Sequence, residues 1–150
     1  MNTFRALASL CLGLSVVAVA CGDDGSGATP PTTGQSCTTA DQCYTAVEPG
    51  ALKGDAVCLD KVEGGYCTHS CTADSDCCAV DGECPSGMPE VCAPFESTGQ
   101  MDCFLSCEDA DLKRAGYTDS AAYCAHYASA AFGCRSTGGG SNNRKVCVPN

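Results

Sequence analysis

The chain contains no tryptophan, and its 150 residues include only four phenylalanines and five tyrosines. So little bulky apolar material cannot fill a large aromatic core, which limits the chain to one or two small domains. Basic residues are scarce too: eight Lys and Arg stand against 18 Asp and Glu, which gives a net charge of −10. This charge argues against non-specific binding to nucleic acid or to anionic lipid.

Signals of catalysis are also missing. The sequence has no Gly-x-Ser-x-Gly or His-Glu-x-x-His motif, and its two histidines are His69 and His126. Both lie near cysteines that we expect to be bridged, so neither has a thiolate partner for nucleophilic catalysis. We therefore predict no enzyme activity, and we expect His69 on a loop surface and His126 on a helix surface.

Cysteine is abundant, with 16 residues, which in a short chain is typical of a disulfide scaffold. The longest apolar run, 6–20, is about 15 residues long, whereas a membrane span needs roughly 20. The run follows a single positive charge at Arg5 and ends in small residues, which predicts a secretory signal peptide over 1–20.

The tetrapeptide Ala18-Val19-Ala20-Cys21 resembles the lipobox of bacterial lipoproteins, with Ala18 where leucine is usual. The resemblance implies that Cys21 carries a diacylglyceryl group and an acylated amino terminus after cleavage. Ordinary signal peptidase cleavage is the alternative, and it would leave a thiol. Removal of the signal discards Cys11 and leaves an odd number of cysteines, so lipidation of Cys21 restores the even number that complete pairing needs.

The following segment has no large apolar side chain and is rich in Gly, Pro, Ser and Thr. It cannot bury enough surface to offset its ordering entropy, so we predict a disordered tether over 21–36. The head then covers 37–150.

We predict that every cysteine of the head forms a disulfide, because an exported chain meets an oxidising compartment. Zinc is the alternative for Cys67 and Cys71 with His69 between them, but the chain has only one other histidine. We expect no metal and no cofactor apart from the lipid. The predicted bridged residues are Cys37, Cys43, Cys58, Cys67, Cys71, Cys77, Cys78, Cys84, Cys92, Cys103, Cys107, Cys124, Cys134 and Cys147.

Short cysteine-bounded segments recur along the head. Residues 37–43 and 71–77 share their spacing, a threonine after the first cysteine and an acidic residue in the loop. Residues 67–71 and 103–107 share a three-residue gap with a serine before the second cysteine. We interpret these segments as degenerate copies of one short loop.

Five motifs of the head match a known pattern: Val57-Cys58-Leu59, Gly64-Gly65-Tyr66-Cys67-Thr68, Asp74-Ser75-Asp76-Cys77, residues 111–117 and Lys145-Val146-Cys147-Val148-Pro149. Together they resemble cysteine-rich lipoproteins that are abundant in myxobacteria and related deltaproteobacteria. The resemblance implies export and a disulfide scaffold, and it carries no known activity. Leu112 stands where that pattern usually has a cysteine.

Secondary structure is expected to be short. Strands are predicted over 56–59, 65–67 and 146–148, with a hairpin turn at Gly64-Gly65. The fold class is therefore a small, disulfide-rich, loop-dominated α+β structure, with short strands and hairpins in its N-terminal part. Two short helices are predicted in its C-terminal part.

The first predicted helix follows Ser106 as its cap and is closed by Gly116, and the second runs over 119–132 between Thr118 and Gly133. On the second helix two tyrosines, 123 and 127, lie four residues apart on a face that we expect to pack inward. A ligand-binding tyrosine stripe is the alternative. We expect Cys124 to bond to the segment that precedes this helix.

Charge is divided unevenly along the chain. Residues 21–111 hold 17 acids, whereas residues 112–150 hold five bases and one acid. We expect the two parts to pair within the molecule, and a partner-binding basic patch is the alternative. Arg135, Arg144 and Lys145 flank Gly138-Gly139-Gly140, which lacks the lysine of a phosphate loop and is interpreted as a hairpin tip.

Composition shifts at Ala93-Pro94, with nine head cysteines before this point and five after it. Complete pairing then requires at least one bridge across the boundary and one covalently coupled domain. Cys77 and Cys78 are candidates for this bridge, and they should reach different partners because neighbouring side chains of an extended segment point oppositely. A boundary at 85–89 would instead allow two separate modules.

The leading functional hypothesis is a lipid-anchored, non-enzymatic binding or structural module of the bacterial cell envelope. We expect an outer-membrane anchor, a head in the periplasm or at the cell surface, and an envelope or extracellular protein as a partner. A protease-inhibitor-like scaffold with the exposed loop 85–89 is one alternative. A calcium- or redox-responsive protein is another, with calcium at Asp74, Asp76, Asp81 and Glu83, although their spacing does not fit an EF-hand.

Overall fold

The computed structural model describes residues 32–95, 99–129, 131–138 and 143–150. The predicted signal peptide, Cys21 and residues 22–31 of the predicted tether lie outside these residues. The described chain is a small, disulfide-rich, loop-dominated α+β structure, as the sequence predicts. Within it, no helix is long and apolar enough to span a bilayer.

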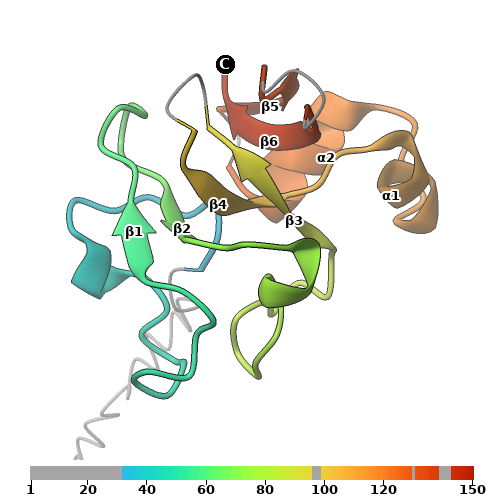
Figure 1. Ribbon diagram of the computed structural model, residues 1–150. Helices are drawn as coiled ribbons and strands as arrows, with labels where there is room; N and C mark the ends of the chain where they lie inside the picture. Colours follow the sequence, from blue (N-terminus) through green and yellow to red (C-terminus); the bar gives the residue numbers. More distant parts are fainter. Residues whose placement is uncertain (1–31, 96–98, 130, 139–142) are drawn as a thin grey trace, which may run out of the picture.

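Three antiparallel hairpins follow one another along the chain (Figure 1). The first pairs β1 (Ala56–Cys58) with β2 (Cys67–His69), and the second pairs β3 (Glu90–Pro94) with β4 (Met101–Leu105). The third pairs β5 (Phe132–Ser136) with β6 (Lys145–Pro149). Single bridges from Ser70 to Asp102 and from Ser106 to Val146 connect each hairpin to the next.

Six of the seven disulfides among the described residues repeat one pattern three times. In each unit of four cysteines, the first bonds to the third and the second bonds to the fourth. The third and fourth cysteines face each other across a hairpin. The bridges are Cys37–Cys58 and Cys43–Cys67 in the first unit, Cys71–Cys92 and Cys77–Cys103 in the second, and Cys107–Cys134 and Cys124–Cys147 in the third.

The first two units also share a capped turn between their first and second cysteines. Short 3-10 helices cover Ala40–Gln42 and Asp74–Asp76. The backbone N–H and hydroxyl of Thr38 donate to Gln42 Oε1, and those of Thr72 donate to Asp76 Oδ2. The prediction that 37–43 and 71–77 are copies of one loop is therefore confirmed.

The third unit replaces this turn by two helices, α1 (Asp109–Arg114) and α2 (Ser120–Tyr127). Gly116 follows α1 with φ +77°, a conformation that suits glycine and ends the helix as predicted. The predicted caps are wrong by one or two residues, since Glu108 and Asp119 occupy the cap positions. Asp119 caps α2 because its carboxylate accepts from the Ala121 N–H at 2.9 Å.

The largest core cluster draws aromatic side chains from all three units. The Tyr66 ring lies 5.4 Å from that of Phe104 and 5.7 Å from that of Phe132, centroid to centroid, and all three are buried. Each such ring contributes roughly 1.5–3 kcal/mol on burial, and each disulfide about 2–4 kcal/mol. The covalent bridges therefore supply much of what a core with so few aromatic residues cannot. Seven disulfides also indicate an oxidising, extracytoplasmic compartment.

Several sequence expectations need correction. The predicted 119–132 helix ends at Tyr127, because the chain turns at Ala128 and Phe132 begins β5, where its ring enters the core. The hairpin β3–β4 and strand β5 were not predicted. Cys124 bonds to Cys147, which follows the helix, rather than to the preceding segment.

The boundaries change as well. Ala93 and Pro94 lie inside β3, so the chain does not divide there. Thr32 and Thr33 are buried, and the Gly34 N–H donates to the Cys67 carbonyl at 3.0 Å, so the tether prediction is wrong for 32–36. These residues belong to the head.

Candidate functional site

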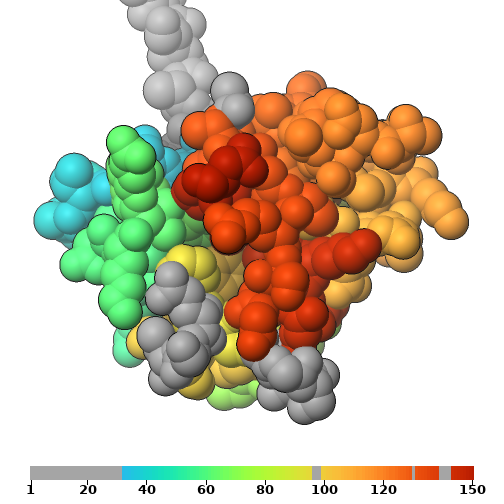
Figure 2. Space-filling model, turned by 90° about the horizontal axis from the view of Figure 1, so that it is seen from above, coloured from blue at the N-terminus to red at the C-terminus, as the bar shows by residue number. Residues whose placement is uncertain are grey.

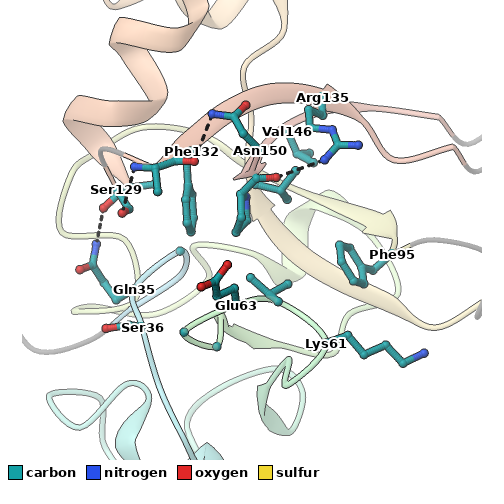
Figure 3. A pocket seen from close by; sticks show the side chains of 18 of the residues that line it. Gln35, Ser36, Lys61, Glu63, Phe95, Ser129, Phe132, Arg135, Val146 and Asn150 are labelled. Carbon is teal, nitrogen blue, oxygen red and sulfur yellow. Dashed lines mark hydrogen bonds between the residues drawn. The ribbon is translucent and has the colours of Figure 1, made fainter.

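A groove of about 740 Å³ lies between the first and third units. Figure 2 shows the green residues near position 60 beside the orange and red residues of the third unit. One wall consists of residues 34–36 and the β1–β2 turn at 61–65. The other wall consists of residues 128, 129, 131, 132, 135–137, 146 and 148–150. Phe95 lies at the end of β3 and completes the lining (Figure 3).

The floor of this groove is apolar. Phe132, Val146 and Val148 come from the third hairpin, and Val62 comes from the first, and all four are at least 92% buried. Polar groups lie around them, among them the side chains of Ser36, Gln35, Ser129 and Asn150. An apolar floor with a few polar groups at its edge is the usual composition of a ligand-binding site.

Two cations, Lys61 and Arg135, lie on the same side of the groove as Phe95 (Figure 3). Both are exposed, and neither forms an ion pair with an acid of the described residues. Arg135 donates one hydrogen bond to the Pro149 carbonyl at 3.3 Å. Glu63 is the single acidic side chain in the lining, so cationic side chains outnumber anionic ones there.

Two other bases of the third unit, Arg144 and Lys145, are paired with acids. Arg144 contacts Asp74 at 2.9 Å and Glu108 at 2.6 Å, and Lys145 contacts Asp109 at 3.0 Å. Each pair joins a base of 112–150 to an acid of 21–111, which confirms the predicted intramolecular complementarity. The tip of the β5–β6 hairpin at Gly139-Gly140 lies outside the described residues.

Three buried polar side chains, those of Thr33, Tyr44 and Glu90, are hydrogen-bonded between the first and second units. The Thr33 hydroxyl donates to Glu90 Oε2 at 2.6 Å and lies 2.6 Å from the Tyr44 hydroxyl. Burial raises the pKa of Glu90 to about 8, the Thr33 hydrogen bond opposes this shift, and the nearby Glu83 carboxylate adds to it. Glu90 is therefore largely protonated at neutral pH.

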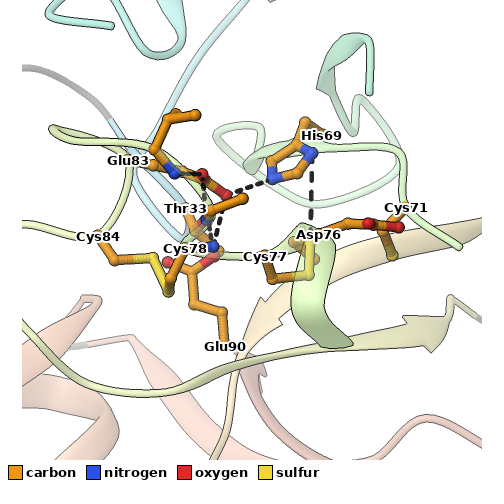
Figure 4. Close-up of polar contacts among 12 residues, drawn as sticks. Thr33, His69, Cys71, Asp76, Cys77, Cys78, Glu83, Cys84 and Glu90 are labelled. Atoms are coloured by element: carbon orange, nitrogen blue, oxygen red, sulfur yellow. Dashed lines mark hydrogen bonds and ion pairs between the residues drawn. A yellow bond between two sulfur atoms is a disulfide. The ribbon is translucent and has the colours of Figure 1, made fainter. Parts of the chain in front are cut away.

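His69 is fully buried, so the prediction of a loop-surface histidine is wrong. It occupies β2, where its Nε2 lies 2.7 Å from Glu83 Oε1 and its Nδ1 lies 2.9 Å from the Ser70 carbonyl (Figure 4). The Glu83 carboxylate also accepts the backbone N–H groups of residues 78, 79 and 80. This network holds the 78–84 loop against β2. His126 is exposed on α2, as predicted.

The structure does not bring the proposed metal ligands together. Cys67 and Cys71 bond to Cys43 and Cys92, and His69 faces Glu83. Of the four acids considered for calcium, Asp74 pairs with Arg144, Asp76 caps a turn, Asp81 is exposed and Glu83 is buried. These carboxylates form no shared cluster within the described part of the chain.

Tyr123 is fully buried and Tyr127 packs on it with ring centroids 4.9 Å apart, so the tyrosine face packs inward as predicted. The loop at 85–89 is exposed from Pro85 to Gly87, and it forms a turn in which the Gly87 N–H donates to the Cys84 carbonyl. Met88 packs partly against the core.

The seventh disulfide, Cys78–Cys84, lies outside the threefold pattern and closes a loop of sequence separation 6. The repeated bridges close loops of 21 to 27 residues. Loop-closure entropy makes the short bridge less stabilising by about 1 kcal/mol. Cys78 also adopts φ +62°, which is unusual for a residue other than glycine. Both cysteines are in the predicted set, but no sequence pattern indicates that they pair with each other.

Sequence reasoning missed Glu90, Thr33 and the groove. Glu90 stands directly before Val91-Cys92-Ala93, but this local pattern does not show whether its carboxyl is buried. Thr33 lies in a segment of tether-like composition that carries no signal of burial either. The groove forms between segments far apart in sequence, so no local motif marks it. Searches against protein-family models, curated proteins and solved structures each give no match.

Proposed function

We propose that the protein is a lipid-anchored, non-enzymatic binding protein of the bacterial cell envelope, and that the groove between its first and third units holds the ligand. The observation that carries this proposal is a buried Val and Phe floor beside two cations without acidic partners among the described residues. In a chain of net charge −10, such a site is complementary to an apolar group that carries a carboxylate. An extended, acidic and aromatic peptide segment of another envelope protein has this chemistry.

The anchor is supported by the lipobox-like residues 18–21 and by cysteine pairing. All 14 cysteines of the head are used in disulfides, which leaves Cys21 without a partner in the secreted chain. The resemblance to cysteine-rich lipoproteins of myxobacteria supports the same assignment. Intact mass of the membrane-extracted protein should show residues 1–20 lost and acyl groups gained. A mature chain with an unmodified Cys21 thiol would contradict the anchor.

Ligand binding is tested by fluorescence anisotropy with a labelled peptide rich in Asp and Phe, and with a second peptide in which Lys replaces Asp. We expect saturable binding of the acidic peptide to the oxidised head and weaker binding as salt rises. The double variant Lys61→Ala with Arg135→Ala should bind roughly tenfold more weakly. The matched control is Lys53→Ala with Lys113→Ala, two exposed lysines outside the groove. Equal binding by both variants, or by both peptides, would contradict the proposal.

A further inference from the structure

The Cys78–Cys84 bridge differs from the other six in access as well as in pattern. Each bridge of the repeated units contains at least one buried cysteine, whereas Cys78 is exposed and Cys84 is half-buried. A hollow of about 350 Å³ opens beside them, lined also by Gly82, Gly87 and Arg114. A thiol from solution therefore meets less obstruction at this bridge than at the repeated bridges, each of which has at least one buried cysteine.

The same bridge lies beside a buried acid. A carboxyl oxygen of Glu90 lies within 4.8 Å of both the Cys78 and the Cys84 Sγ atoms (Figure 4). The Thr33 hydroxyl holds the Glu90 carboxyl in place by donating to its Oε2. The loop itself is fixed because the Cys78 N–H donates to Glu83 Oε1 at 2.6 Å. The disulfide and the carboxyl are thus held in a fixed relation.

We propose that the Cys78–Cys84 disulfide is a thiol–disulfide exchange site that oxidises dithiols, with Glu90 as the proton donor to the leaving sulfur. An exposed disulfide in a short loop is the kind that exchanges readily, and a neutral acid beside the leaving thiolate lowers the cost of its departure. The site is separate from the groove and does not depend on the binding function proposed for it.

The exchange takes two displacements. One thiolate of the dithiol attacks Cys78 Sγ, the bond to Cys84 breaks, and the electron pair goes to Cys84 Sγ. Glu90 gives its carboxyl proton to that sulfur and becomes a carboxylate. The second thiolate of the dithiol then attacks the dithiol sulfur that is bonded to Cys78. A disulfide forms within the dithiol, and Cys78 leaves as a thiolate. The dithiol loses two electrons to the protein disulfide, and solvent returns protons to Cys78 and to Glu90.

Several groups set the charge around Glu90. The hydroxyls of Tyr44 and Tyr66 interact electrostatically with Glu90. Burial raises the pKa of both hydroxyls, so they stay neutral in the pH range in which Glu90 titrates. The nearby Glu83 carboxylate disfavours ionisation of Glu90, and the Thr33 hydrogen bond favours it. Because the pKa of Glu90 is about 8, the proton is present at neutral pH and is lost above it.

The test uses dithiothreitol as the dithiol and the oxidised wild-type head. Timed samples are alkylated and the labelled cysteines are located by peptide mass spectrometry. We expect Cys78 and Cys84 to be labelled at least about tenfold faster than any other pair. The rate of reduction of Cys78–Cys84, divided by the concentration of dithiothreitol thiolate, should fall as the pH rises through about 8. Earlier reduction of a repeated bridge, or a rate per thiolate that does not change with pH, would overturn the proposal.

The Glu90→Gln substitution removes the carboxyl proton and keeps the shape of the side chain. We expect this variant to reduce roughly tenfold more slowly at Cys78–Cys84 at pH 7 and to lose the pH dependence. The half-buried Cys37–Cys58 bridge is the internal control and should not slow. Glu48→Gln, at an exposed glutamate, is the matched control variant. A faster or unchanged Glu90→Gln would overturn the role of Glu90, since mere loosening of the loop speeds reduction.

Discussion

Arg144 and Asp74 are 70 residues apart in sequence, and Arg144 Nη1 donates to both carboxylate oxygens of Asp74, at 3.0 and 2.9 Å. The same guanidinium donates through Nε to Glu108 at 2.6 Å. Asp74 in turn accepts the backbone N–H of Cys92 in β3. One arginine of the third unit therefore connects the capped turn and the hairpin of the second unit.

Replacement of Arg144 by Met should lower the free energy of unfolding by about 1 kcal/mol, because partly exposed ion pairs contribute little even when several converge. Chemical denaturation of the oxidised head measures the change. The double-mutant cycle with Asp74→Asn should show a coupling that weakens with salt. Lys113→Met, at an exposed lysine, is the control and should leave stability unchanged. An effect of Arg144→Met no larger than that control would contradict this role.

The free energy of unfolding should fall as the pH rises from 6 to 8. The pKa of Glu90 is about 8 in the folded protein against an ordinary 4.5, because burial disfavours its carboxylate. The folded state thus keeps a proton that the unfolded chain releases. This stabilisation is complete below about pH 4.5 and is lost as the pH rises through about 8. Asp102 shifts in the same direction, to a pKa of about 6, so Glu90 dominates above that value.

Denaturation of the oxidised head at several pH values measures this slope. We expect a loss of about 1 kcal/mol per pH unit in the wild type and a much smaller loss in Glu90→Gln. A wild type whose stability is constant or rises between pH 6 and 8 would show that Glu90 is ionised in the fold.

Two buried tyrosines should respond differently to loss of their hydroxyls. The Tyr44 hydroxyl lies 2.6 Å from Thr33 Oγ1, whereas that of Tyr123 is buried without a hydrogen-bond partner among the described residues. Tyr44→Phe should therefore cost about 1 kcal/mol, while Tyr123→Phe should be neutral or stabilising. Melting temperatures of the two oxidised variants make the comparison. A large loss in Tyr123→Phe would mean that its hydroxyl has a partner.

The Cys77–Cys103 bridge joins the part of the chain that ends at Cys92 to the part that begins at Cys103. It is the only disulfide of the described residues that does so. A protease site inserted at 96–98 should yield two pieces that stay together in non-reducing electrophoresis. The same cleavage in Cys77→Ser with Cys103→Ser should release them. Cys37→Ser with Cys58→Ser is the control, and its pieces should remain joined. Separation of the wild-type pieces without reductant would show a different pairing.

The sequence predicted the scaffold and its coupling because cysteine count and spacing are local, countable properties. The expectation that Cys77 and Cys78 have different partners, and that one of them crosses Ala93-Pro94, is confirmed by their bonds to Cys103 and Cys84. The third unit was not predicted as a repeat, because helical residues separate its first two cysteines where the other units have a short turn.

The site could not be predicted in the same way. His69 stands between two cysteines in a segment read as a loop, and only pairing with β1 shows that its side chain turns inward. Hairpin β3–β4 contains the buried acids Glu90 and Asp102, which obscure the hydrophobic pattern of its strands. The groove depends on how the first hairpin packs against the third, which no local pattern determines.

Chemical-shift mapping of the ¹⁵N-labelled, oxidised head during titration with the acidic, aromatic peptide shows where the ligand binds. We expect the largest changes to cluster at the groove, in the backbone amides of Ser36, Gly64, Phe132 and Asn150. Changes confined to the exposed loop 85–87 would favour the inhibitor-like alternative instead. Such a result, or a spectrum that the peptide leaves unchanged, would contradict the assignment of the groove as the binding site.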